Sequence, residues 1–265
     1  MGISFFVKLC LSFLIGSVWV TLSTVAAERF GSKIGGLIGG LPSTAFVALL
    51  FIGITQSPLA ASAATTVIPL TQGFNGLFIL VFILLVRRGL VAGLAGALIV
   101  WFLLASLLVF SGIQNFLLSV VGWLLLVVFC CFAVEKWMVI SSKEKITVHY
   151  SFSQIIFRAL FSGCVIAFAV LVGRLGGPVF GGLFATFPAM FLSTLIITYR
   201  AGGAEFSRAV AKSMMVSGMV NVVLYTIAIR YLYPWVGLFY GTGIALFFSF
   251  VTGYLTYLFI RARLS

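Results

Sequence analysis

Long apolar runs limit the fold of this chain more than any other feature of its sequence. Residues 59–86, for example, contain no charged side chain. About 20 consecutive apolar residues cross the hydrocarbon core of a bilayer as a helix. Of the 265 residues, 63% are hydrophobic and 8% are charged, a composition that excludes a soluble domain. The short alternating segments of a membrane β-barrel are absent from the sequence. The pattern predicts an all-α polytopic membrane protein in the lipid bilayer, and we expect it to be a multi-pass protein of the plasma membrane.

Polar markers between the apolar runs predict nine membrane-spanning helices. We interpret the first run as a true helix, because it is longer than the apolar core of a secretory signal. The expected limits of the nine helices are 4–27, 34–54, 59–86, 89–111, 115–138, 152–172, 178–199, 206–230 and 235–260.

Basic residues fall unevenly on the two sides of these nine helices. Thirteen Lys and Arg residues lie on one side, and only Lys8, Arg174 and Arg230 lie on the other. Cytoplasmic loops carry the excess of Lys and Arg, so we expect the N-terminus outside and the C-terminus inside. Loop charge also explains most of the net charge of +12, and nucleic acid is therefore not an expected partner. As an alternative, some of these basic residues bind an anionic solute or an anionic lipid.

The chain contains an internal repeat. A shift of 146 residues lays GGLIGGLP, residues 35–42, over GGLFATFP, residues 181–188, and lays Asn75 over Asn221. A shift of 145 residues lays Gly73 over Gly218 and Gly96 over Gly241. A nearly constant offset across three successive predicted helices indicates a duplication.

The duplication predicts a 4+1+4 plan. Residues 1–112 form the first repeat, residues 113–150 form a linker helix with a cytoplasmic loop, and residues 151–265 form the second repeat. Because five helices separate the starts of the two repeats, the repeats are inverted relative to each other. Inverted repeats are an architecture of secondary transporters.

The second half also resembles a known family. Its GGLFATFP stretch is followed by Thr198-Tyr199, Gly203, Arg208-Ala209 and Met214. This pattern is similar to the small GlpM-like bacterial membrane proteins, over about residues 155–260. Those proteins are four-helix chains with a G-L-x-P-x-F-P core, and Ala185 stands where the first of these prolines is expected. The resemblance implies a four-helix unit, here fused as an inverted pair, that smaller relatives would assemble by dimerising. A homodimer of this chain stays open.

The sequence offers little for catalysis. General acid–base chemistry uses His, Asp or Glu, but the chain has no Asp, its one His is in the predicted polar loop, and its four Glu are at predicted helix ends. No metal-binding motif occurs, and we expect neither an enzyme nor a bound metal or cofactor. Proton-coupled carriers use acidic groups or His within the membrane. Sodium coupling through carbonyls, hydroxyls and amides, or passive transport, therefore stays open.

The two proline-terminated stretches are the candidate binding segments. Glycine and proline weaken a helix, and paired interruptions in inverted halves indicate a substrate site. Close packing of helices at small residues is the alternative interpretation, and both can hold at different glycines. The candidate residues in and next to these stretches are Gly39, Gly40, Pro42, Ser43, Thr44, Thr186 and Pro188.

Polar residues of two further predicted helices complete the candidate site. Asn75 and Asn221 should face the interior, to bond either substrate or neighbouring helices. Ser217 lies one turn from Asn221, on the same face. Arg208 and Lys212, one turn apart, either form a cationic entrance to the site or extend towards the cytoplasmic surface.

We therefore expect a secondary transporter that moves a small or amphipathic anionic solute by alternating access. The first alternative is a flippase or scramblase for a phosphate-bearing lipid carrier. The second is a membrane scaffold that transports nothing.

Overall fold

The structure is a computed structural model that describes residues 4–29, 42–137 and 151–264. Within these ranges the side chains of residues 27–29, 135–137, 213, 216, 217 and 256–264 are not described. The described residues form helices and contain no β-strand. The helices are α1 (Phe5–Arg29), α3 (Ser43–Thr55), α4 (Pro58–Ala64), α5 (Ile68–Leu85), the 3-10 turn η1 (Val86–Arg88), α6 (Leu90–Ser111), α7 (Phe116–Trp137), α8 (Phe152–Gly176), α9 (Pro178–Ala185), α10 (Ala189–Val236) and α11 (Leu238–Leu264).

Eight segments of the described chain are long and apolar enough to cross a membrane. The helix Ser43–Thr55 is apolar but shorter. Large apolar side chains are exposed on the outer helices, including Phe110 at 88% on α6 and Leu117 at 69% on α7. Side chains of this kind suit contact with lipid rather than water. The all-helical membrane fold expected from composition is therefore confirmed.

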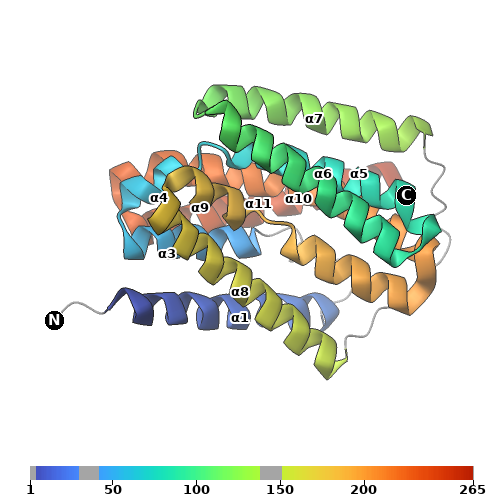
Figure 1. The fold of residues 1–265 in the computed structure, drawn as a ribbon, viewed down its shortest axis with the longest axis horizontal. Helices are drawn as coiled ribbons and strands as arrows, with labels where there is room; N and C mark the ends of the chain where they lie inside the picture. The colour runs from blue at the N-terminus through green and yellow to red at the C-terminus, as the bar shows by residue number, and fades with distance from the viewer. Residues whose placement is uncertain (1–3, 30–41, 138–150, 265) are drawn as a thin grey trace.

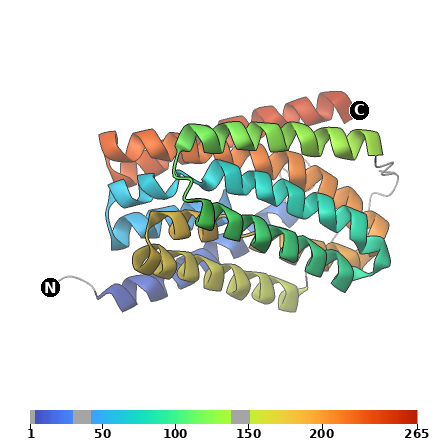
Figure 2. The same cartoon turned by 45° about the horizontal axis from the view of Figure 1, so that its top comes forward.

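The long helices lie side by side along one axis of the molecule (Figures 1 and 2). The helix α1 packs against α8, and the two run in opposite directions. The helix α5 packs against α6, α7 and α10, while α11 packs against α10. The helix α7 lies along one edge of the bundle (Figure 1).

Two of the predicted spanning segments are interrupted within their length. Residues 59–86 divide at Thr65–Val67 into α4 and α5, and residues 178–199 divide at Thr186–Pro188 into α9 and α10. Between the predicted helices 178–199 and 206–230 the structure has a sharp kink inside α10, where Gly203 has φ 73° and ψ −168°. This backbone conformation is essentially restricted to glycine. Residues 189–202 and 204–236 of α10 are therefore two helices that meet at Gly203.

Two buried apolar clusters hold these helices together. One gathers around α5, α6, α7 and the middle of α10, with Phe78 and Trp101 among its largest side chains. The other gathers around α3, α4, α8 and the last part of α10, with Ile52 and Tyr225 among its members. The breaks in α4/α5 and α9/α10 lie between the two clusters.

Close backbone packing explains the second-half glycines of the repeat. A Cβ at Gly173 would lie 3.0 Å from the Cα of Gly181, and a Cβ at Gly182 would collide with the carbonyl oxygen of Ala64. Glycine at these positions lets α8, α9 and α4 approach one another. Helix packing is therefore the role of these three glycines, whereas the break itself occurs further along, at Thr186–Pro188.

Candidate functional site

Pro42 and Pro188, equivalent under the shift of 146 residues, begin two helices in the same way. Pro42 precedes α3 with φ −74° and ψ 53°, and Pro188 precedes α10 with φ −73° and ψ 40°. The carbonyl of Pro42 accepts from the Phe46 N–H at 2.7 Å, and that of Pro188 from the Leu192 N–H at 2.8 Å. Proline fixes φ near these values and removes one N–H that a helix start leaves unpaired. The repeat in the sequence is thus also a repeat in local structure.

The two helix starts converge on one cavity. From it α3 and the first part of α10 run in opposite directions (Figure 1). The N-cap residue of each helix is a proline, which supplies no side-chain capping bond. The first turn of a helix presents N–H groups without partners inside the helix, and its dipole places partial positive charge there. Two positive helix ends therefore face one small space.

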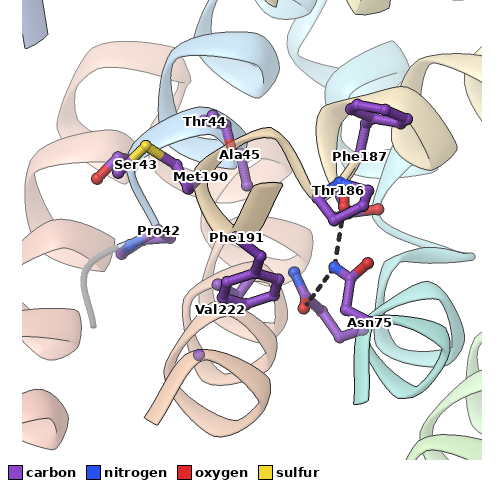
Figure 3. Close-up of a pocket in the computed structure, with 13 residues that line it drawn as sticks. Pro42, Ser43, Thr44, Ala45, Asn75, Thr186, Phe187, Met190, Phe191 and Val222 are labelled. Carbon is purple, nitrogen blue, oxygen red and sulfur yellow. Dashed lines mark hydrogen bonds between the residues drawn. The ribbon is translucent and has the colours of Figure 1, made fainter. Parts of the chain in front are cut away.

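The cavity has a volume of about 50 Å³. In Figure 3 Pro42, Ser43 and Met190 lie on one side of the view, and Asn75 and Thr186 lie on the other. The lining residues are Pro42, Ser43, Thr44, Ala45, Gln72, Asn75, Thr186, Phe187, Pro188, Met190, Phe191, Gly218 and Val222. They offer amides, hydroxyls, a thioether and apolar surface, and none carries a charge. Such a space holds a few waters or one small ion.

Asn75 ties three parts of the molecule together at this cavity. Its Nδ2 donates to Gln72 Oε1 at 3.0 Å and to the carbonyl oxygen of Thr186 at 2.9 Å (Figure 3). Its Oδ1 accepts from Trp101 Nε1 at 2.9 Å. Thr71 and Thr186 share a further hydrogen bond at 2.8 Å between their hydroxyl groups. The interrupted segment of the second half is thus held by side chains of the first half.

Asn221 has a matching position in the second half. Its Oδ1 accepts from Ser249 Oγ at 3.0 Å and from Thr252 Oγ1 at 2.9 Å, both on α11. In each half, then, the repeated asparagine accepts from the helix that follows its own. Interhelical hydrogen bonding is the role that these contacts assign to both residues.

Of the predicted site residues, Pro42, Ser43, Thr44, Asn75, Thr186 and Pro188 lie together at the cavity. Asn221, Arg208 and Lys212 are not among its lining residues. Gly39 and Gly40 lie outside the described part of the chain, and the side chain of Ser217 is also outside it.

Arg208 is held away from the cavity by other partners. It is 5% exposed, its Nη1 pairs with Glu205 at 2.8 Å, and its Nε donates to the carbonyl oxygen of Ile83 at 3.2 Å. Glu205 also pairs with Arg87 at 2.8 Å. The Glu205 carboxylate thus balances part of the positive charge of Arg87 and Arg208. The cationic entrance to the site expected at Arg208 and Lys212 stays a prediction.

The site residues chosen from the sequence do not include Gln72, which is one of the polar residues of the predicted helix 59–86, or Trp101, and these two complete the polar network. Gln72 was visible as a partner of Asn75 at i+3, a spacing that places both on one helix face. Nothing local marked Trp101, because its indole N–H finds Asn75 only through the packing of α6 on α5.

A second cavity of about 240 Å³ lies at the break between α4 and α5. Thr66 lines it together with Gln114 and Pro178. The Thr66 hydroxyl accepts from Arg230 Nη1 at 3.0 Å, and the Arg230 guanidinium lies 4.3 Å from the ring centre of Phe116. Arg230 is one of the three basic residues predicted on the side opposite Arg208.

Family comparison matches both halves of the chain, at residues 9–115 and 155–262, to one family described as a protein of unknown function (DUF3147). The chain belongs to the DUF3147 family. Two matches to a single DUF3147 unit are consistent with a duplicated family. The GlpM-like likeness of the second half stays a resemblance, since the family match does not carry that name. The chain matches no curated protein and no solved structure.

Proposed function

We propose that this protein is a secondary transporter that moves a small anionic solute across the plasma membrane by alternating access. The observation that carries the proposal is the meeting of two helix N-termini, each with a repeated proline at its N-cap, at one uncharged polar cavity. Interrupted helices in transporters point such ends at anionic groups. Partial positive charge in a low-dielectric interior favours an anion over a neutral solute or a cation.

An inverted 4+1+4 plan of nine crossings, with the N-terminus outside and the C-terminus inside, is part of the proposal. Eight candidate spans and the shorter helix Ser43–Thr55 supply segments for these crossings. The opposite directions of α1 and α8, which begin the two matched regions, support the inversion (Figure 1). The linker crossing corresponds to α7, which lies between the two matched regions along the chain.

A pair of matching contacts supports a two-fold relation between the halves. Ser62 Oγ donates to the carbonyl oxygen of Arg230 at 2.8 Å, and Arg208 Nε donates to that of Ile83 at 3.2 Å. A shift of 146 residues lays Ser62 over Arg208 and lays Ile83 over Ile229, the neighbour of Arg230. Superposing each half on the other therefore places each of these two hydrogen bonds close to the position of the other. A relation of this kind lets two inverted halves swap conformations and open the site to opposite sides.

The lining of the cavity supports transport rather than catalysis. Its side chains include no Asp, Glu, His, Cys or Lys that could act as a general acid, a general base or an activated nucleophile. For the same reason we propose either passive transport or coupling to sodium through carbonyl and amide oxygens, and not a proton relay.

The lipid-carrier alternative requires exposed cations at a lateral opening. Arg208 is buried and paired with Glu205, which favours a small solute over a phosphate-bearing lipid. A membrane scaffold would need the glycine packing at Gly173, Gly181 and Gly182 but no polar cavity beyond it.

The test is anion flux in liposomes that contain the purified full-length protein. Labelled acetate and labelled inorganic phosphate are loaded, and their release is followed with and without a sodium gradient. Gly218→Val is the blocking variant, because even a Cβ at Gly218 would lie 2.8 Å from the Phe191 ring that lines the cavity. Gly243→Val is the matched control, since nothing lies within 4 Å of a Cβ there.

We expect release by the wild-type protein and by Gly243→Val, and its loss in Gly218→Val. Release no faster than from empty liposomes would contradict the proposal, and so would equal release by both variants. Translocation of a labelled phosphate-bearing lipid without release of either solute would favour the flippase or scramblase instead.

A further inference from the structure

The Gln72 carboxamide lines the cavity with only one of its two ends hydrogen-bonded. Gln72 lies near the start of α5 and is 4% exposed. Its Oε1 accepts from Asn75 Nδ2 at 3.0 Å. Among the residues that the structure describes, none accepts a hydrogen bond from its Nε2. Because burial of an unpaired amide nitrogen costs free energy, this donor suits a partner that enters the cavity from outside.

The unpaired end of this carboxamide faces the cavity. In the described part of the chain, Nε2 does not belong to the polar atoms that packing encloses without a partner, so it reaches open space. The open space that Gln72 lines is the cavity at the starts of α3 and α10. The hydrogens of Nε2 and the first-turn N–H groups of the two helices therefore meet in one small volume.

Neighbouring groups fix which end of the carboxamide is turned to the cavity. An indole N–H can only donate, and a backbone carbonyl can only accept. Trp101 Nε1 donates to Asn75 Oδ1 at 2.9 Å, and Asn75 Nδ2 donates to the carbonyl oxygen of Thr186 at 2.9 Å. These two bonds leave the Asn75 amide one orientation. Since Nδ2 is then the atom that meets Gln72, Gln72 presents Oε1 to it and turns Nε2 away (Figure 3).

Asn75 itself has no donor left for a ligand. Its two Nδ2 hydrogens are used by Gln72 and Thr186, and its Oδ1 accepts from Trp101. Gln72 is thus the amide of this network that can bind a ligand. Both Gln72 and the two helix N-termini offer N–H groups, so the cavity suits a ligand that accepts hydrogen bonds, and a ligand that only donates them is disfavoured.

We propose that Gln72 determines the specificity of this cavity, and that the substrate is a small oxyanion of the size of formate or nitrate. The proposal rests on the anion transport proposed above and adds the substrate class to it. A volume of about 50 Å³ leaves room for only a few heavy atoms. Gln72 Nε2 donates to one oxygen of the anion, and the first-turn N–H groups of α3 and α10 bind the rest of it.

Two planar ions of similar size and opposite hydrogen-bonding character test this assignment. Nitrate only accepts hydrogen bonds, whereas guanidinium only donates them. Titration calorimetry with the purified full-length protein compares both ions for the wild-type protein, Gln72→Met and Gln72→Glu. Gln72→Met keeps the length of the side chain without the donor, and Gln72→Glu puts an acceptor in the place of Nε2. Gln56→Met is the matched control, because Gln56 is exposed at the far end of α3 and does not line the cavity.

We expect the wild-type protein and Gln56→Met to bind nitrate with equal affinity and not to bind guanidinium. Gln72→Met should weaken nitrate binding about tenfold or more, which is the scale of a lost hydrogen bond to a charged group. Gln72→Glu should abolish nitrate binding and admit guanidinium, because its carboxylate repels the anion and accepts from the cation. A general loss of packing would weaken the binding of nitrate without this reversal of preference.

Nitrate binding at the wild-type affinity in Gln72→Met or in Gln72→Glu would overturn the assignment, and either variant decides this if the other fails to fold. Wild-type binding of nitrate would then leave the transport proposal standing. If the wild-type protein did not bind nitrate but released acetate or phosphate from liposomes, the substrate class named for this cavity would be wrong and transport would stand. Neither binding nor release would contradict both proposals.

Discussion

The two halves of the chain begin their site helices alike, but they differ at the corner where each of these helices ends, at Ser57 in the first half and at Gly203 in the second. Pro42 and Pro188 have nearly the same backbone angles. At the following corner, Ser57 is extended and caps α4, whereas its counterpart Gly203 has φ 73°. Beyond the corner, the first half breaks again at Thr65–Val67, while α10 continues to Val236. The feature at the cavity is common to both halves, and the features away from it have diverged.

The second break in the first half serves the packing of the other half. Gly182 of α9 lies against the carbonyl of Ala64, at the end of α4. The broken segment of the second half therefore rests on the extra break of the first. The two halves thus differ in structure at the place where α4 of the first half packs against α9 of the second.

Gly182→Ala should have the largest effect on stability. The added Cβ meets backbone, which cannot rotate away, so we expect a loss of about 2–4 kcal/mol in the free energy of unfolding. Thermal unfolding in detergent measures this loss. Gly243→Ala, where a Cβ meets nothing within 4 Å, should remain within about 0.5 kcal/mol of the wild-type protein. Equal melting temperatures of the two variants would show that the close contact between α4 and α9 does not contribute to stability.

Substitution of the two repeated asparagines should have intermediate and similar effects. Interhelical hydrogen bonds in membranes contribute about 0.6 kcal/mol each, so loss of the two bonds from Asn75 to Thr186 and Trp101 in Asn75→Ala should cost about 1 kcal/mol. Asn221→Ala should cost an amount within about 1 kcal/mol of this value if the halves are equivalent at this position. Unfolding of the two variants side by side gives the comparison. A loss of stability in Asn75→Ala with none in Asn221→Ala would mean that only the first half depends on hydrogen bonds from its repeated asparagine.

A reciprocal exchange at the corner should give the most asymmetric effects, and its Ser57→Gly arm should give the smallest. Gly203→Ser places a side chain in a conformation that only glycine adopts easily, so we expect a cost of about 1–3 kcal/mol. Ser57→Gly loses the bond from the Ala60 N–H to Ser57 Oγ, but glycine is itself a tolerated N-cap, so the cost should be a few tenths of 1 kcal/mol. The same unfolding assay measures both. Similar costs at both positions would show that the corners are built alike.

Much of the fold could be predicted from local chemistry. Apolar runs identify the helices, the repeated proline marks the start of α10, and the need to pair an amide in lipid places Asn75 inside. The break at Thr65–Val67 also left a signal, because Pro69 lies in the first turn of α5, where proline begins helices rather than continuing them.

Other parts of the site depend on tertiary packing and could not be predicted. Arg158 is one of the thirteen basic residues counted on the predicted cytoplasmic side, and no sequence pattern shows that it is buried in α8 with its Nη2 against Met190 Sδ of α10. Trp101 finds Asn75 across two helices. No local pattern specifies which turn of one helix meets which residue of another.

Access to Ser43 from both sides of the membrane tests the central claim most directly. Ser43→Cys is made in a chain whose four native cysteines, Cys10, Cys130, Cys131 and Cys164, are replaced by alanine. It is labelled with a membrane-impermeant thiol reagent in right-side-out and in inside-out vesicles. Ser43 is buried at the cavity, so labelling requires the site to open. Ser111→Cys, at the exposed end of α6, should be labelled from one side only. The account predicts labelling of Ser43→Cys in both kinds of vesicle, slowed by a transported anion. Labelling from a single side, or from neither, would contradict alternating access at this cavity.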